Sequence, residues 1–205
     1  MRNITEDLPV SETKALLSEN EQIKTIEHHF GKIMLALGLD LDDDSLKDTP
    51  RRVAKMFINE AFSGLNPLNE PSVTLFKNKF KYNEIVLEKN IPLYSYCEHH
   101  FVPIVGKVHI AYISKGEVIG LSKLNRIAQY FSKRPQIQER LTIQIAAYLK
   151  AVMQIEDVAV IINAEHLCVA SRGVNNTGCA TVTSSMHGRF LRQEISSQLY
   201  AMLTL

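Results

Sequence analysis

The sequence predicts an α+β fold in which an antiparallel sheet packs beside helices. Two observations lead to this class. Apolar residues spaced three and four apart, a spacing typical of helices, occur near the N-terminus and again in the second half of the chain. Between them lies a region rich in Val, Ile, Tyr and Phe with stretches of alternation, which is typical of strands. Runs of strands interrupted by a helix pair indicate α+β with an antiparallel sheet.

Two helices are predicted before the sheet. The first spans about residues 21–37, where apolar side chains recur at helical spacing, and Gly38 suits its C-terminal end. The second is indicated by Thr49 and Pro50, a capping residue followed by proline at the first helical position. Residues 1–19 are polar and aperiodic, so we expect a flexible arm there.

The sheet is predicted to begin after these helices. Residues 72–113 alternate in places, and the Ser-Lys-Gly sequence at 114–116 suits a hairpin turn. A helix is expected to begin at Ser122 as its N-cap, and a further helix to open at Pro135. The remaining elements are three strands and a terminal helix, predicted at 157–163, 166–171, 181–184 and 192–203.

The chain shows no linker that would split this core. We therefore expect one main domain over residues 67–205, preceded by a helical segment at 20–66 and the arm at 1–19.

Composition excludes several function classes. The 205 residues are 45% hydrophobic, and 23 basic residues nearly balance 22 acidic ones, giving a net charge of +1. No global field therefore favours nucleic acid or a membrane surface. Three cysteines are a small and odd number, which does not make a disulfide framework. Free thiols in a reducing compartment are therefore expected. Without an apolar leader or a membrane-spanning run, we expect a cytoplasmic protein.

Two segments carry candidate metal ligands. Residues 97–100 read Cys-Glu-His-His, and residues 166–168 read His-Leu-Cys. Thiolate and imidazole are the ligand types that zinc prefers. In an extended chain Cys97 and His99 share a face, whereas a turn after Cys97 would bring His100 to the same ion. Spacing alone leaves both histidines open.

The number of ligands separates two kinds of zinc site. Cys97, one histidine and Cys168 make three protein ligands, which leaves a position for water and marks a catalytic site. With Cys179 as a fourth ligand, the site would be closed and structural. Cys179 follows a turn-like stretch without a neighbouring ligand, so we interpret it as a bystander.

A set of basic and polar residues suggests a phosphorylated substrate. Helix N-termini flanked by cations are natural phosphate sites, although each of these residues alone would be read as a solvated surface group. The candidates are Ser122, Lys123, Arg126, Arg172 and, in the first turns of the second helix, Arg51, Arg52 and Lys55. A separate polar feature, Gln138, Glu139 and Arg140 near another helix start, would by itself be interpreted as ordinary helix-surface polarity.

The chain carries several long motifs in a fixed order: TPRRVAKM (49–56), YCEHHFVP (96–103), GKVHIAY (106–112), GLSKLNRI (120–127), RPQIQERL (134–141) and the segment 166–174. Together they resemble the GTP cyclohydrolase I family over about residues 20–203.

The resemblance implies roles for single residues. It implies one zinc ion per subunit, bound by Cys97, His100 and Cys168, and catalytic roles for His99 and His166. It also implies contacts to GTP. Glu139 would hold the guanine edge, Gln138 and Ser122 would lie around the substrate, and the triphosphate would be held by Lys123, Arg126, Arg172 and Lys55.

The resemblance further implies a tunnelling fold, with a four-stranded antiparallel sheet, a helix pair on one face, and a barrel formed by oligomerisation. The expected assembly is a homodecamer of two pentameric rings, with sites at subunit interfaces. The implied reaction opens the imidazole ring of GTP at C8, releases formate and closes 7,8-dihydroneopterin triphosphate. It is the first step of tetrahydrofolate and pterin biosynthesis, and no nucleic acid or membrane partner is expected.

Three alternatives compete with this interpretation. A zinc-stabilised binding module would need Cys179 as a fourth ligand. Another tunnelling-fold enzyme, acting on a pterin or a deazapurine, would not be expected to carry both zinc segments and the phosphate cluster. A catalytically inactive homologue is disfavoured because every expected site residue is present.

Overall fold

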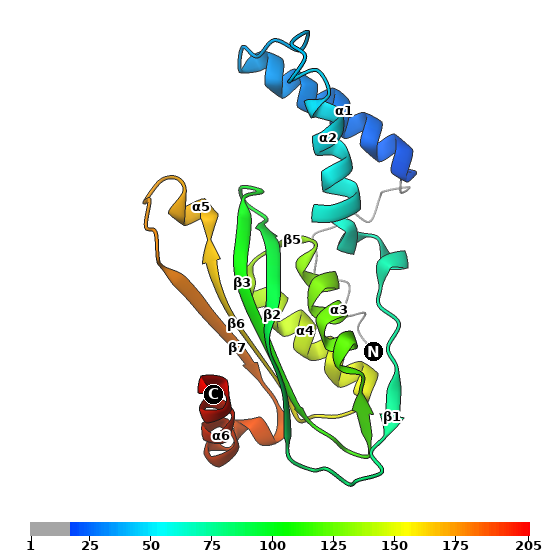
Figure 1. Cartoon of the computed structure of the whole chain (residues 1–205), viewed down its shortest axis with the longest axis vertical. Coiled ribbons are helices and arrows are strands. Elements are labelled where there is room, and N and C mark those ends of the chain that lie inside the picture. The colour runs from blue at the N-terminus through cyan, green and yellow to red at the C-terminus, as the bar shows by residue number, and fades with distance from the viewer. Residues whose placement is uncertain (1–16) are drawn as a thin grey trace. The chain divides into compact units, whose positions relative to one another are not determined.

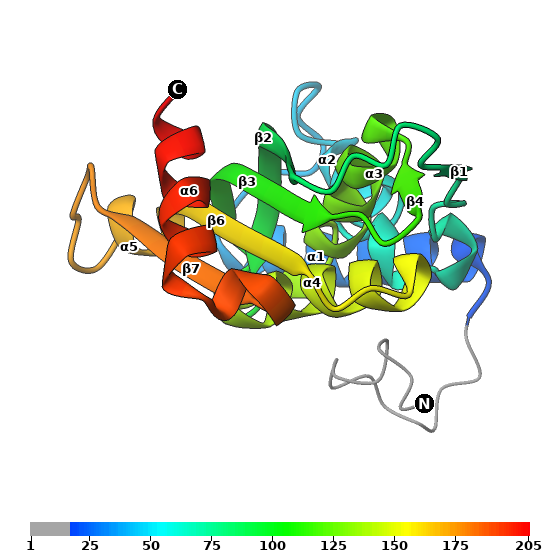
Figure 2. The same ribbon diagram turned by 90° about the horizontal axis from the view of Figure 1, so that it is seen from below.

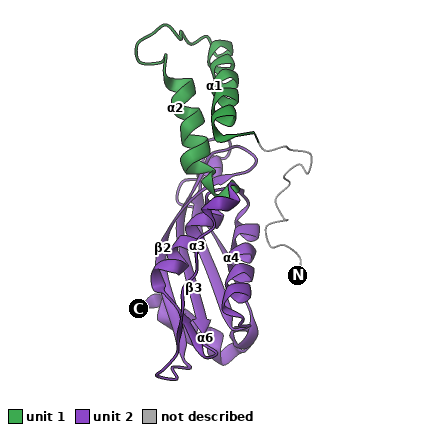
Figure 3. Ribbon diagram, turned by 90° about the vertical axis from the view of Figure 1, so that its right-hand side faces the viewer, with its two compact units in different colours: residues 1–65 green, residues 66–205 purple. Residues whose placement is uncertain are grey.

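The computed structural model describes residues 17–205, so most of the predicted arm at residues 1–19 lies outside the described residues. The chain divides into two compact units, one extending to Leu65 and the other spanning Asn66–Leu205 (Figure 3). Within residues 17–205, no helix has the length and apolar character that crossing a membrane requires.

The first unit is built on two packed helices. Helix α1 (Glu19–Ala36) begins with a capping box, in which the backbone N–H of Ser18 donates to the Glu21 carboxylate at 2.8 Å. Helix α2 (Thr49–Met56) packs against α1 and carries its proline in the first turn, as predicted. Its capping position is one residue earlier than predicted. A π-helical turn (Phe57–Ala61) and a 3-10 turn (Ser63–Leu65) complete this unit.

The second unit is built on a five-stranded sheet in the order β5-β2-β3-β6-β7 (Figure 1). Its four long strands pair antiparallel: β2 (Ile85–Cys97), β3 (Pro103–Ile113), β6 (Val158–His166) and β7 (Ala180–Met186). The fifth strand, β5 (Pro135–Gln136), is short and runs parallel to β2 at the edge. A separate two-stranded sheet pairs β1 (Leu75–Lys77) with β4 (Glu117–Ile119). The expected α+β class with an antiparallel sheet is thereby confirmed.

Helices cover both faces of the large sheet. Helix α3 (Leu121–Ser132) and helix α4 (Gln138–Met153) bury their apolar sides against one face, whose core includes Val108 and Ile110. Helix α6 (Gln193–Thr204) packs on the other face, where Ala111 contributes to a second core. Figure 2 shows α4 and α6 on opposite sides of the sheet. Successive side chains of β3 point to opposite faces of the sheet, so Ile110 and Ala111 belong to different cores.

Close contact between β3 and β6 depends on Gly106. A Cβ atom at this position would overlap the backbone oxygen of Asn163 and the Cα atom of Ala164. Glycine is therefore the residue that lets the two strands approach. Because β6 ends at His166, two residues beyond Ala164, this contact also fixes the end of the strand that leads into the candidate site.

Four further local predictions were wrong. The Ser-Lys-Gly sequence at 114–116 does not close a hairpin, because the strand that follows it, β4, pairs with β1 and not with β3. Helix α3 begins at Leu121 with Gly120 at the capping position, so Ser122 lies in its first turn. Pro135 does not open a helix, because α4 begins only at Gln138. Pro135 lies in edge strand β5, where a proline is tolerated although it has no N–H to donate. Residues 166–171 are not a strand, because β6 ends at His166 and the short helix α5 (Leu167–Ala170) follows.

Candidate metal and nucleotide site

The turn between β2 and β3 brings His100 back towards Cys97. The carbonyl of Cys97 accepts hydrogen bonds from the backbone N–H of His100 at 3.4 Å and of Phe101 at 2.8 Å. Phe101 has a left-handed φ of 54°, which reverses the chain direction, and the Cys97 N–H donates to the Val102 carbonyl at 2.9 Å. The side chains of Cys97 and His100 are therefore held on the same side of a closed turn.

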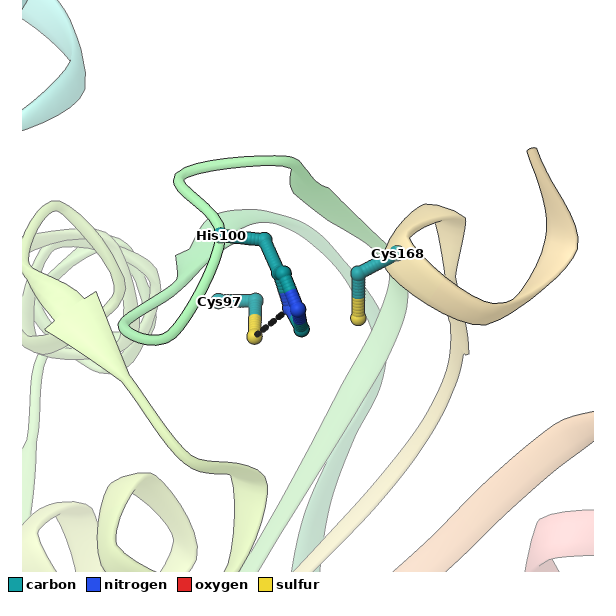
Figure 4. A group of neighbouring side chains, drawn as sticks. All are labelled: Cys97, His100 and Cys168. Atoms are coloured by element: carbon teal, nitrogen blue, oxygen red, sulfur yellow. Dashed lines mark hydrogen bonds between the residues drawn. The ribbon is translucent and has the colours of Figure 1, made fainter. Parts of the chain in front are cut away.

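Helix α5 supplies the third member of the group. Its second residue, Cys168, faces Cys97 and His100, and the three ligand atoms all lie within 4.8 Å of one another (Figure 4). The Nδ1 atoms of His99 and His100 lie 3.7 Å and 3.8 Å from Cys97 Sγ, but His100 is the one that completes the group with both thiols. The exposed Cys179 is not a member.

The donor set fits a soft or borderline divalent metal. Cys97 and Cys168 are free thiols, both buried, at 6% and 8% exposure. Burial, followed by the neighbouring Cys97 thiol, raises the pKa of Cys168 above its ordinary value, and Arg172 offsets this only in part. A bound cation stabilises cysteine as thiolate, and two sulfurs with one imidazole suit zinc.

Arg172 lies beside the metal group. Its Nη1 is 3.3 Å from His100 Nε2, and the same atom donates to the carbonyl of Cys168 at 3.4 Å. One of the cations predicted to hold a triphosphate is therefore adjacent to the candidate metal ligands.

The start of α4 brings three more predicted residues together. The Nε2 atom of His166 lies 2.8 Å from the Oε1 atom of Gln138, whose side chain is 1% exposed. Burial lowers the pKa of His166 below its usual value, and the nearby Glu139 carboxylate acts in the opposite direction. His166, Gln138 and Glu139 thus belong to one cluster, with Glu139 exposed to solvent.

Sequence reasoning missed the residue that anchors the turn carrying His100. Arg140 donates to Glu98 at 2.6 Å, and also to Gln136 Oε1 at 3.0 Å and to the Pro135 carbonyl at 2.9 Å. The other carboxylate oxygen of Glu98 lies 3.8 Å from Nε2 of the exposed His99. Glu98 and Arg140 are the sequence neighbours of the candidate residues His99 and Glu139. Because the two residues lie 42 positions apart, nothing in the sequence near either one indicates that they are paired.

The remaining predicted substrate residues lie elsewhere. Ser122 and Arg126 are exposed in the first turns of α3, and the Lys123 ammonium donates to Ser72 Oγ at 3.4 Å. Lys55 is exposed on α2, in the other compact unit.

An α+β core that presents a Cys-His-Cys group able to hold a metal ion, with His99 and Arg172 beside it, is an arrangement typical of metalloenzymes. Comparison with known proteins gives the family. The family model for GTP cyclohydrolase I matches residues 26–204. The chain belongs to the GTP cyclohydrolase I family.

Curated relatives carry the same family name. The GTP cyclohydrolase 1 of Flavobacterium johnsoniae is 52% identical over 182 residues, covering 89% of this chain and 82% of that protein. The GTP cyclohydrolase 1 of Buchnera aphidicola is 51% identical over 174 residues, covering 85% and 80%. The enzyme of the same name from Aeromonas salmonicida is 50% identical over 177 residues, covering 86% and 81%.

Proposed function

We propose that this chain catalyses the GTP cyclohydrolase I reaction. Water adds at C8 of guanine, the imidazole ring opens, formate leaves, and the ribose carbons close a new ring to give 7,8-dihydroneopterin triphosphate. The observation that carries this proposal is the Cys97, His100 and Cys168 group in a chain of this family. We place the reaction in the cytoplasm, as the first step of tetrahydrofolate and pterin biosynthesis.

The metal is proposed to be zinc, one ion per subunit, held by Cys97, His100 and Cys168. When bound, it supplies Lewis acidity that makes water a nucleophile at neutral pH. The protein contributes two buried thiols on fixed elements, since one ends β2 and the other lies in α5. The hydrogen bond from Arg140 to Glu98 stabilises the turn that follows Cys97.

GTP binding is proposed to divide into a guanine contact and a triphosphate contact. The Glu139 carboxylate would accept hydrogen bonds from N1–H and the 2-amino group of guanine, a pair of donors that adenine lacks. Several fixed cations are needed for a triphosphate. The proposed cationic and hydroxyl contacts are Lys123, Arg126, Arg172, Lys55 and Ser122.

Two histidines are proposed to handle protons. His166, beside Glu139, would give a proton to the imidazole nitrogen of guanine as water adds to C8. His99, exposed next to the metal ligands and close to Glu98, would serve the later proton transfers of the ribose rearrangement.

The assembly is proposed to be a homodecamer of two pentameric rings with the tunnelling fold. The strands β2 and β7 lie near the two sides of the sheet, and β7 forms one edge, which is an arrangement suited to a barrel formed by several copies. Lys55 would then serve a site whose metal belongs to another copy.

A direct assay tests this proposal. Zinc-loaded protein is incubated with GTP, and both formate and the fluorescent pterin formed after oxidation are measured, with and without a chelator. The expected result is chelator-sensitive production of both. Absence of both products from folded, zinc-bearing protein would overturn the proposal and favour a zinc-stabilised binding module.

A further inference from the structure

We propose that Gln138 holds the proton of His166 on Nε2, so that Nδ1 is the nitrogen that exchanges a proton with the substrate. Gln138 is then a positioning residue for His166 and not a direct ligand of GTP. The catalytic meaning of this assignment rests on the proposed function, whereas the proton position is a property of the folded protein alone.

The orientation of the Gln138 amide is fixed by two backbone carbonyls. Its Nε2 atom donates to the Ile162 carbonyl at 3.1 Å and to the Thr181 carbonyl at 2.9 Å. A carbonyl oxygen can only accept a hydrogen bond, so rotating the amide by 180° would set oxygen against oxygen twice. In a side chain that is 1% exposed, no water can relieve that repulsion.

Two threonines reinforce the same orientation. Gln138 Nε2 also lies 3.1 Å from Thr183 Oγ1, and the Thr183 and Thr142 hydroxyls are 2.7 Å apart. The Thr142 hydroxyl donates to the backbone carbonyl of Gln138 at 2.7 Å, which leaves Thr183 as the donor of the pair. A closed ring of hydrogen bonds therefore runs from the amide through both hydroxyls and back to the same residue.

The amide oxygen of Gln138 determines which ring nitrogen of His166 carries the proton. With Nε2 committed to the sheet, Oε1 is the Gln138 atom that faces His166, at 2.8 Å from the ring Nε2. An amide oxygen is an acceptor, so the hydrogen between them belongs to His166 Nε2 whether the ring is neutral or charged. The substrate must then be served by Nδ1.

This arrangement also removes Gln138 from the substrate contacts. Both amide hydrogens are engaged by acceptors on β6 and β7, and the oxygen faces His166. Because Gln138 is held by the sheet, it fixes the orientation of the His166 imidazole ring. In other functional histidines, a hydrogen-bond partner on the ring nitrogen that does not do the chemistry has the same effect.

The proton position is read directly by nitrogen NMR. Zinc-loaded protein labelled with 15N-histidine is observed through two-bond couplings at one pH where the ring is neutral, and the His166 signals are assigned from their loss in a His166→Gln variant. We expect the protonated-nitrogen shift at Nε2 and the lone-pair shift at Nδ1. The reverse pattern in the wild-type protein would overturn the proposal, with no other variant required.

A second readout separates positioning from substrate contact. In Gln138→Met we expect a mixture of the two tautomers and a fall in kcat of about 10²-fold, with KM for GTP changed little. A rise in KM at unchanged kcat would show a substrate contact and overturn the positioning role. Gln144→Met, which replaces another buried glutamine of α4 at 2% exposure, is the matched control and should keep the wild-type tautomer.

The two proposals fail separately. Wild-type protein that releases no formate but shows the Nε2–H tautomer would overturn the proposed function and leave the assignment standing. Active protein with the Nδ1–H tautomer would do the reverse.

Discussion

The guanidinium of Arg140 donates to the carboxylate of Glu98 at 2.6 Å, and this bond ties the first turn of α4 to the turn that carries the candidate metal ligand His100. Both side chains are largely buried, at 15% and 25% exposure. Because Arg140 also donates to Gln136 and Pro135, the pair is held on the sheet edge formed by β5. The turn that carries the candidate metal ligand is therefore stabilised by contacts from outside its own sequence.

Removing these contacts should weaken the metal site. In Arg140→Met the Glu98 carboxylate loses a charge-assisted bond worth about 2 kcal/mol, so the free energy of unfolding should fall by about that amount. Zinc affinity, measured by competition with a chromophoric chelator, should fall roughly tenfold. Arg51→Met, at an exposed position of α2, is the control. Unchanged zinc affinity in Arg140→Met would show that the turn needs no such support.

The two candidate cysteine ligands should be distinguishable from the third cysteine by metal content. Cys97→Ser and Cys168→Ser should each lose nearly all bound zinc, because serine offers no thiolate. Cys179→Ser should keep one zinc per chain, since that exposed side chain lies outside the group. Elemental analysis of the purified variants checks this. Loss of zinc from Cys179→Ser would instead indicate a closed, structural site.

The roles proposed for Glu139 and Arg172 predict that substitutions at the two residues impair different parts of GTP binding, the guanine contact and the triphosphate contact. Glu139→Gln should lower kcat/KM for GTP by about 10²-fold or more, because one carboxylate oxygen that accepts from guanine is replaced by a donor. Inhibition by inorganic triphosphate, which has no base, should stay unchanged in this variant and weaken in Arg172→Met. Equal effects of both substitutions on triphosphate inhibition would contradict the division into guanine and phosphate contacts.

Strand spacing predicts a stability effect at Gly106. Gly106→Ala places a methyl group in the backbone of β6, so the strands must separate, and we expect a loss of about 3 kcal/mol in the free energy of unfolding. Gly31→Ala is the matched control: its new methyl group would meet its nearest neighbour at 3.7 Å, an ordinary contact, inside helix α1. Chemical denaturation of both variants measures the difference, and equal stabilities would contradict the close approach.

The sequence predicted the fold class and the candidate ligand types, but not the contacts that arrange them. Periodicity placed α1 close to where it lies, and the strand predicted at 181–184 and the helix predicted at 192–203 overlap β7 and α6. Spacing left His99 and His100 open, because the choice depends on a turn with left-handed Phe101.

Contacts between distant residues were out of reach for sequence reasoning. Gln138 and His166 are 28 positions apart, and nothing local to either residue indicates that they are hydrogen-bonded. Pro135 misled the helix prediction for a related reason. A proline at a helix start and a proline in an edge strand look alike until the neighbouring strand is known.

The central claim is that the Cys97, His100 and Cys168 group enables opening of the guanine ring at C8. The most direct measurement follows GTP labelled with 13C at C8 by NMR, using zinc-loaded protein, chelated protein and chelated protein resupplied with zinc. Labelled formate is expected from the first and third samples and none from the second. Labelled formate at an undiminished rate from protein shown to be free of metal would contradict it.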